Sequence, residues 1–384
     1  MHVLKGKLPD LFEFGDGGRV RSREDWLRRR EELRELLLGL EYGHLPPQPT
    51  SVRGDLLHHH AVTLPVKADH FQYRLVIEGG ERPFWFILDL MAPPIEDRSA
   101  AGKQLPVVVN GDGCWRYVTE AVVGEVLGRG YALATFNRTE IVPDDYRTAR
   151  DSALYLVYPE GDFGALAAWA WGYHRVVDFL MAQDHVDASR IAVVGHSRGG
   201  KTVLLAGATD ERIALTAPNN SGSGGAGSFL WQGDGCEKLE DGVRMVPYWY
   251  APRWGEFIGR EDELPFDQHA LKALVAPRAL LSTEALGDLW ANPSGTYQTH
   301  CAAREVYRFL NAEERIGIWY RDGDHDHGLA DWTAFLDFAD LQFRGLQAGC
   351  RFDLNPFPEM PSAFSWSAPP VPISPSPQGP SGST

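Results

Sequence analysis

Three side chains capable of acyl-transfer chemistry follow three successive apolar runs of the chain, in the order serine, acid, histidine. Ser197, Asp288 and His325 each come shortly after such a run. A serine hydroxyl is a weak nucleophile, and it needs an imidazole to accept its proton and a carboxylate to orient that imidazole. The order therefore predicts that Ser197 attacks an ester carbonyl while His325 moves the proton and Asp288 orients His325.

The residues around Ser197 read Gly-His-Ser-Arg-Gly from 195 to 199 and fit the pattern G-x-S-x-G. The glycines permit a tight turn from a strand into a helix, which holds the serine hydroxyl out over the sheet. A serine at this place can also be an ordinary N-cap of the helix. The apolar run before Ser197 and the helical pattern after it favour the nucleophile.

Two alternatives remain for the acid and the base. Glu284 competes with Asp288 as the carboxylate, and His327 competes with His325 in the segment Asp-Gly-Asp-His-Asp-His-Gly at 322–328. We favour His325 because it comes first after its strand and turn. A metal cluster in this segment lacks a fourth ligand elsewhere in the sequence, so we expect neither a metal nor a cofactor.

The developing oxyanion needs donors that are already in place. The expected donors are the backbone N–H groups of Arg198, Gly111, Asp112 and Gly113. Lys201 follows Ser197 by four residues on the same helix face, so its side chain can also reach the site. Two cations beside a nucleophile on an acidic chain favour an anionic or polyhydroxylated substrate.

The elements that must position these residues alternate along the chain. An antiparallel pair is expected at 72–78 and 83–91, and further strands at 105–113, 131–137, 190–195, 212–218, 278–284 and 315–321. Helical patterns occupy 161–183, 197–208, 294–310 and 329–346. Continuous apolar runs alternating with helices indicate a mostly parallel sheet covered on both faces. With the serine, acid, histidine order, they predict an α/β-hydrolase fold.

The domain organisation is predicted from changes in composition. Residues 1–50 are expected to form a helical extension with an amphipathic helix at 21–40, and residues 51–350 the hydrolase domain. An insertion at about 221–274, rich in Gly and Trp, is too long for a simple connection and is expected to form a cap or rim. The segment 355–384 is rich in Pro and Ser and is predicted to be disordered.

Charge and composition exclude several classes of partner. The 384 residues carry a net charge of −15, which argues against nucleic acid. No apolar run is long enough to span a membrane, and the four cysteines are scattered as free thiols. The chain shows no secretory signal, so we expect a cytoplasmic protein unless a leader has been removed. The sequence does not predict an oligomeric state.

The motifs resemble those of the glucuronoyl esterases, carbohydrate esterase family 15, and of the bacterial branch especially. That family's elbow reads G-C-S-R-x-G-K, and this chain has Gly-His-Ser-Arg-Gly-Gly-Lys at 195–201. Segments 210–225, 263–293 and 323–328 are also similar. The resemblance implies cleavage of the ester between a glucuronoyl carboxyl and an alcohol. It further implies that the Arg198 side chain holds the oxyanion, that Lys201 holds sugar hydroxyls, and that Trp290 lines the sugar site.

The chain departs from the fungal members at several site positions. Asn220 lies in the segment where they carry the catalytic glutamate, which transfers the acid's role to Asp288. Leu289 replaces a glutamate and Asn219 replaces a glutamine, so Asn219 and Asn220 are expected to contact the substrate as amides. Fewer hydrogen bonds to the sugar keep two alternatives open. One is an esterase for acetyl or short-acyl carbohydrate esters, and the other is an inert binding protein on the hydrolase scaffold.

Overall fold

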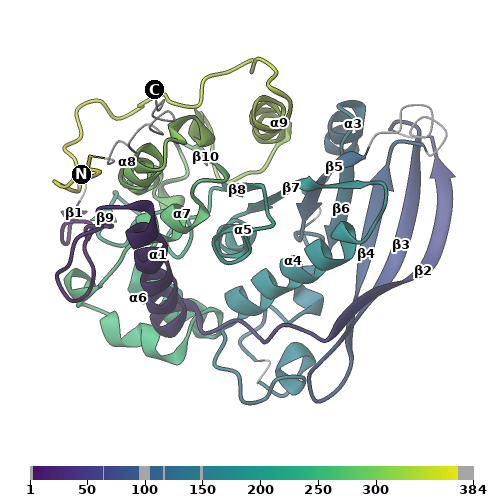
Figure 1. Ribbon diagram of the computed structural model, residues 1–384, viewed down its shortest axis with the longest axis horizontal. Helices are drawn as coiled ribbons and strands as arrows, with labels where there is room; N and C mark the ends of the chain where they lie inside the picture. Colours follow the sequence, from purple (N-terminus) through teal and green to yellow (C-terminus); the bar gives the residue numbers. More distant parts are fainter. Residues whose placement is uncertain (1–2, 64, 95–103, 116, 148–149, 371–384) are drawn as a thin grey trace, which may run out of the picture.

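A nine-stranded sheet forms the centre of the molecule (Figure 1). The computed structural model describes residues 3–63, 65–94, 104–115, 117–147 and 150–370. Six neighbouring strands of this sheet are parallel, and the three strands at its other side are antiparallel. In spatial order the strands are β11 (Ile316–Arg321), β10 (Ala279–Ala285), β8 (Leu215–Asn219), β7 (Val186–His196), β5 (Leu105–Asn110), β6 (Ala132–Phe136), β4 (Phe84–Ala92), β3 (Ala68–Glu78) and β2 (Ser51–Val62).

Helices cover both faces of the parallel part of this sheet, which confirms the predicted α/β fold. In Figure 1, α4 (Ala165–Met181) and α5 (Arg198–Thr209) lie on one face, and α3 (Glu120–Gly128) and α9 (Leu329–Arg344) lie on the other. The other α-helices of the described residues are α1 (Arg23–Leu37), α6 (Leu239–Met245), α7 (Gln268–Val275) and α8 (Pro293–Phe309). The parallel strands therefore present their carboxyl ends at one edge, where ligand sites form in such sheets.

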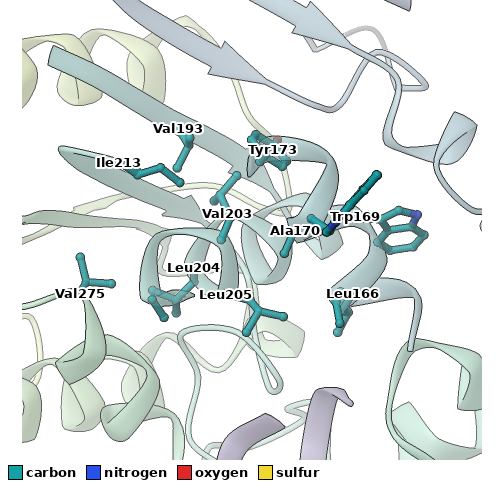
Figure 2. Close-up of a cluster of buried hydrophobic side chains, with 14 of the residues drawn as sticks. Leu166, Trp169, Ala170, Tyr173, Val193, Val203, Leu204, Leu205, Ile213 and Val275 are labelled. Atoms are coloured by element: carbon teal, nitrogen blue, oxygen red, sulfur yellow. The ribbon is translucent and has the colours of Figure 1, made fainter. Parts of the chain in front are cut away.

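A large buried apolar cluster packs the sheet against α4 and α5 and extends to α1, α7 and α8; Figure 2 shows part of it. Val193 of β7, Val203 of α5 and Leu166 of α4 belong to it, and all three are fully buried. Helix α4 is buried around nearly its whole circumference and most of its residues are apolar, unlike those of a surface helix. This packing holds the end of β7 and the start of α5 rigidly together.

The end of the described chain corrects the predicted disordered tail. Residues 355–370 pack against the domain, and Ala363 is fully buried beside Leu8. The indole Nε1 of Trp366 donates a hydrogen bond to the Leu8 carbonyl at 2.9 Å. The disorder prediction is therefore wrong for 355–370, because a few large side chains bury enough apolar surface to fix a Pro-rich segment. Residues 371–384 lie outside the described residues.

The predicted helix at 21–40 is α1, which begins after the N-cap Ser22 and buries Trp26, Leu33 and Leu37. The segment 221–274 contains α6, α7 and several short helical turns, and part of it borders the site described below. The chain before α1 adds a two-residue strand, β1 (Val3–Leu4), which pairs with β9 (Trp231–Gln232). No helix in the described part of the chain is both long and apolar enough to cross a membrane.

Candidate active site

The turn between β7 and α5 places Ser197 outside the sheet. Its backbone has φ +56° and ψ −121°, a conformation that is strained for a residue with a side chain. A Cβ at Gly195 would collide with the backbone of Gly199, and a Cβ at Gly199 would collide with the Asp112 carboxylate. The Ser197 hydroxyl makes no capping bond to its own helix. The two glycines thus permit the turn, and the hydroxyl is left for another partner.

That partner is His325. Its Nε2 lies 2.9 Å from the Ser197 Oγ, and its Nδ1 lies 2.5 Å from Asp288 Oδ2. Asp288 follows β10 and His325 follows β11, so two neighbouring parallel strands deliver them to the same edge. The Asp288 side chain is only 3% exposed, whereas His325 is 39% exposed and faces the pocket. The structure therefore joins all three residues in one hydrogen-bonded chain.

Glu284 and His327, the alternatives for the acid and the base, lie outside this hydrogen-bonded chain. Glu284 is fully buried within β10 near Lys272, and burial raises the pKa of its carboxyl well above the usual value. His327 is buried and stacks on Trp332, with ring centroids 5.1 Å apart. Burial, followed by the nearby His196 and Arg321, lowers the pKa of His327 well below its usual value. Of the four candidates for acid and base, Asp288 and His325 are therefore the two that the structure joins to Ser197 by hydrogen bonds.

The loop 111–113 does not supply oxyanion donors, which corrects the sequence expectation for Gly111, Asp112 and Gly113. Each N–H already has a partner: Gly111 donates to the Tyr173 hydroxyl (2.6 Å), Asp112 to Asn110 Oδ1 (3.0 Å), and Gly113 to the Phe136 carbonyl (3.2 Å). The loop closes on itself, on helix α4 and on the end of β6. The N–H of Arg198 remains, because the first residues of a helix lack intrahelical partners.

Asp112 instead stabilises the turn between β7 and α5 that carries Ser197. Its carboxylate forms a fully buried ion pair with Arg138. Its Oδ2 also accepts a hydrogen bond from the backbone N–H of His196 at 2.8 Å. Burial raises the pKa of Asp112, and the Arg138 charge and the hydrogen bonds act against this rise. Asp112 therefore fixes the backbone immediately before Ser197.

The Arg198 side chain is held beside the nucleophile by aromatic rings and a carboxylate. Its guanidinium lies 5.1 Å from the ring centroid of Trp115 and 4.8 Å from that of Trp249. Its Nη1 donates to Asp144 Oδ2 at 2.7 Å, and Asp144 also accepts from Tyr248 and Trp249. Burial opposes ionisation of Asp144, but the Arg198 charge and these hydrogen bonds lower its pKa below the usual value. The guanidinium is therefore preorganised close to Ser197.

A pocket of about 210 Å³ opens beside Ser197 and His325. Lys201 lies at its wall, nearly buried, and its Nζ donates to Glu237 Oε2 at 2.7 Å and to the Ser223 carbonyl. Trp290 lines another side and is 44% exposed. In the described residues no group of three or more His, Cys, Asp or Glu side chains is arranged to hold a metal ion.

Asn219 does not contact this pocket, so its predicted role in substrate binding is wrong. Its fully buried side chain accepts a hydrogen bond from His196 Nδ1 at 2.6 Å and donates to Thr283 and Asp331. Asn220 does border the pocket, but its amide is committed to the protein. Its Oδ1 accepts from the Ala285 N–H at 2.7 Å, and its Nδ2 donates to the Asp326 carbonyl at 3.1 Å. Asn220 thereby connects the end of β10, which precedes Asp288, to the loop that carries His325.

Several residues of the site were not predicted from the sequence. Glu237 lies in the insertion, and nothing in its local sequence points to Lys201. Asp144 and Arg138 come from the segment after β6, where no motif marks them. Arg321 ends β11 and holds the loop that carries His325 through hydrogen bonds to the carbonyls of Asp324 and Asp326. Only its place at a strand end could have indicated it.

A mostly parallel α/β sheet with a strained serine turn, a histidine and a buried aspartate at successive strand ends defines an α/β-hydrolase of the serine esterase class. A family model described as glucuronyl esterase, fungi, matches residues 91–311. The chain is 33% identical over 376 residues to the 4-O-methyl-glucuronoyl methylesterase of Podospora anserina, covering 92% of this chain and 73% of that protein. The chain belongs to the glucuronoyl esterase family, carbohydrate esterase family 15.

Solved structures agree with this placement. A glucuronoyl esterase of the same family from Caldicellulosiruptor kristjansonii superposes with a TM-score of 0.81 at 32% identity, covering 94% of this chain and 97% of that one. A promiscuous esterase of the family from a marine bacterial metagenome superposes with a TM-score of 0.76 at 27% identity, covering 88% and 97%. The predicted family, fold and enzyme class, a carboxylic ester hydrolase, are confirmed.

Proposed function

We propose that the protein hydrolyses esters of 4-O-methyl-glucuronic acid with Ser197 as nucleophile, His325 as general base and Asp288 as its orienting carboxylate. The observation that carries this proposal is the hydrogen-bonded chain from Asp288 through His325 to the Ser197 hydroxyl, which borders the pocket of Lys201 and Trp290. The name of the Podospora relative supports the acid part of the ester.

The reaction proceeds in two acyl-transfer steps. Ser197 Oγ attacks the ester carbonyl carbon while its proton passes to His325 Nε2, and Asp288 stabilises the imidazolium that forms. The carbonyl oxygen becomes an oxyanion beside the Arg198 N–H and guanidinium. Collapse breaks the bond to the alkoxy oxygen, which takes the proton from His325 and leaves as the alcohol. Water, deprotonated by His325, then attacks the acyl enzyme, and the uronic acid and free Ser197 are regenerated.

Lys201 and Trp290 are placed to bind the sugar. An ammonium group has three N–H donors, and Lys201 uses two of them on Glu237 and Ser223. The third donor is left for a hydroxyl of the uronosyl ring, and the exposed indole of Trp290 offers an apolar face to that ring. A compact pocket with an apolar wall and few polar groups is typical of a small-molecule site.

An ester panel tests this function. We expect the wild type to hydrolyse benzyl and methyl glucuronate in preference to acetylated glucose, and Ser197→Ala to lose this activity by about 10⁴-fold or more. Ser189→Ala, which changes an exposed serine, serves as the matched control and should retain full activity. A preference for the acetylated sugar would replace this proposal with a short-acyl esterase.

Active-site labelling separates enzyme from inert scaffold. A fluorophosphonate probe should label the wild type and Ser189→Ala, and it should fail to label Ser197→Ala. Absence of labelling in the wild type, together with no hydrolysis of any ester in the panel, would favour a binding protein on the hydrolase scaffold.

A further inference from the structure

His196 occupies the position before the nucleophile where the family motif has a cysteine. Its side chain is fully buried, and its ring lies against that of His325, with centroids 4.5 Å apart and planes at 45°. The ring of Tyr117 meets it edge-on at 4.6 Å. A second imidazole is therefore packed directly against the proposed base, and the catalytic scheme above gives it no role.

The hydrogen bonds around Asn219 fix the proton of His196. The Asn219 Nδ2 donates to Thr283 Oγ1 at 2.9 Å and to Asp331 Oδ1 at 3.1 Å, which leaves its Oδ1 facing His196 Nδ1 at 2.6 Å. An amide oxygen only accepts, so Nδ1 of His196 carries the proton. The Nε2 of His196 then bears a lone pair, and it has no hydrogen-bond partner among the described residues.

The surroundings keep this imidazole neutral. Burial, and next the charge of His325, lower the pKa of His196 to about 4. The titratable or charged groups that face it are the rings of Tyr117, His325 and His327 and the carboxylates of Asp112, Asp288 and Asp326. The hydrogen bond with Asn219 and then the charges of Asp288 and Asp326 favour a charged His196, but burial outweighs them, so the ring is uncharged at neutral pH.

We propose that His196 is a positioning residue for His325: as a neutral imidazole protonated on Nδ1, it holds the His325 ring and favours the charged form of that ring. An electron-rich ring beside a cation stabilises it, whereas a second positive charge would repel it. His325 becomes a cation when it takes the Ser197 proton, so the stabilisation acts on the transition state. This inference rests on the proposed role of His325 as the base.

Nitrogen NMR on histidine-labelled wild-type protein tests the tautomer directly. We expect His196 to show a protonated Nδ1 and a bare Nε2 at pH 7 and to remain neutral down to about pH 5, because its pKa is lowered to about 4. A protonated Nε2 at pH 7, or a titration of His196 between pH 5 and 8, would overturn the proposal.

The pH dependence of kcat/KM for benzyl glucuronate tests the effect on His325. In His196→Leu, the imidazolium of His325 loses the neutral ring beside it, so the acidic limb should move to lower pH by up to about one unit and kcat should fall by up to about tenfold. His327→Leu removes another buried imidazole of the same stack that is not in ring contact with His325, and it should leave the limb in place. A lower kcat with an unmoved acidic limb would mean that His196 only packs against His325, which would overturn the proposal. An equal shift of the limb in both variants would also overturn it.

A second substitution covers the case in which His196→Leu does not fold. His196→Cys introduces the residue that the family motif carries, and it should move the acidic limb in the same direction. Failure of the proposed function has a different signature, which is a wild type without Ser197-dependent hydrolysis. The present inference fails if the wild type is active but neither substitution of His196 moves the acidic limb of the pH profile of kcat/KM.

Discussion

Arg138 and Asp112 form an ion pair without exposed side-chain atoms directly beneath the nucleophile turn. The guanidinium also lies 5.1 Å from the ring centroid of Trp169. Two charges removed from water are tolerated only while each neutralises the other, and removal of one partner leaves an uncompensated buried charge. Because Asp112 also accepts the His196 N–H, this pair connects the stability of the core to the geometry of the turn.

We predict that Asp112→Asn lowers the free energy of unfolding by about 3–5 kcal/mol, since it leaves Arg138 buried without a counter-charge. The amide oxygen can still accept the His196 N–H, but the amide NH2 cannot accept from Arg138, so the loss includes one hydrogen bond as well as the charge. Urea unfolding monitored by circular dichroism measures the change. The control is Glu240→Gln, which removes the exposed pair with Arg244 and should leave the midpoint unchanged. Equal midpoints for wild type and Asp112→Asn would contradict the prediction.

Arg321 holds the loop that carries His325. Its Nε lies 2.9 Å from Asp331 Oδ1, and its Nη2 donates to the Asp324 and Asp326 carbonyls. We predict that Arg321→Met lowers kcat by about 10- to 100-fold with little change in KM, because a base displaced by about 1 Å loses its alignment with Ser197. Steady-state kinetics on a glucuronate ester measure the changes in kcat and KM separately.

Arg321→Lys should recover part of this kcat, because an ammonium can still pair with Asp331. Arg351→Met is the matched control, since Arg351 is exposed and pairs with the exposed Asp353. A rise in KM at constant kcat would mean that Arg321 acts on substrate binding and not on the base.

The parallel strands and the placement of Ser197, Asp288 and His325 at their ends were predictable because the signals for both are local in the sequence. Apolar runs buried on both faces mark β5, β7, β8 and β10, and parallel strands end at the same edge. Residues that follow such runs therefore meet in space, as Ser197, Asp288 and His325 do. Glu284 pairs in register with Tyr320 inside the sheet, so it lies before this edge.

The remaining features depend on contacts between distant segments. The loop 111–113 has the glycines of an oxyanion loop, but Tyr173 from α4 takes the Gly111 N–H. Asn219 looks like a substrate ligand by its place after β8, yet its amide is used by His196 and Asp331. The long edge strand β2 has mostly exposed residues, so it lacks the apolar run that predicts a strand. Local sequence patterns contain no signal for such pairings.

The Lys201 and Glu237 pair should determine affinity for the sugar. Glu237 Oε2 fixes the Lys201 ammonium at 2.7 Å, and Glu237→Gln keeps the shape while it removes the charge. We predict that KM for benzyl glucuronate rises by about tenfold, because a looser ammonium binds a hydroxyl less well. Hydrolysis of p-nitrophenyl acetate, which has no sugar hydroxyl, should not change. A parallel loss on both substrates would show damage to the catalytic residues.

The buried His174 predicts that the fold weakens in acid. Its Nε2 donates to the Ala206 carbonyl at 3.1 Å, and burial lowers its pKa to about 4. An unfolded histidine has a pKa near 6.5, so below that pH the unfolded chain binds the extra proton and the folded chain does not. The stability from this group is therefore complete above about pH 6.5 and is lost as the pH falls toward 4, by about 3 kcal/mol.

Urea unfolding at pH 7, 5.5 and 4.5 measures this dependence. His174→Gln keeps a donor for the Ala206 carbonyl but cannot titrate, so its stability should fall less steeply with acid than that of the wild type. His58→Gln changes an exposed histidine on the edge strand β2 and should retain the wild-type slope. If His174→Gln also kept that slope, the acid sensitivity would have to come from the other buried histidines, of which His196 has its pKa lowered to about 4 by burial as well.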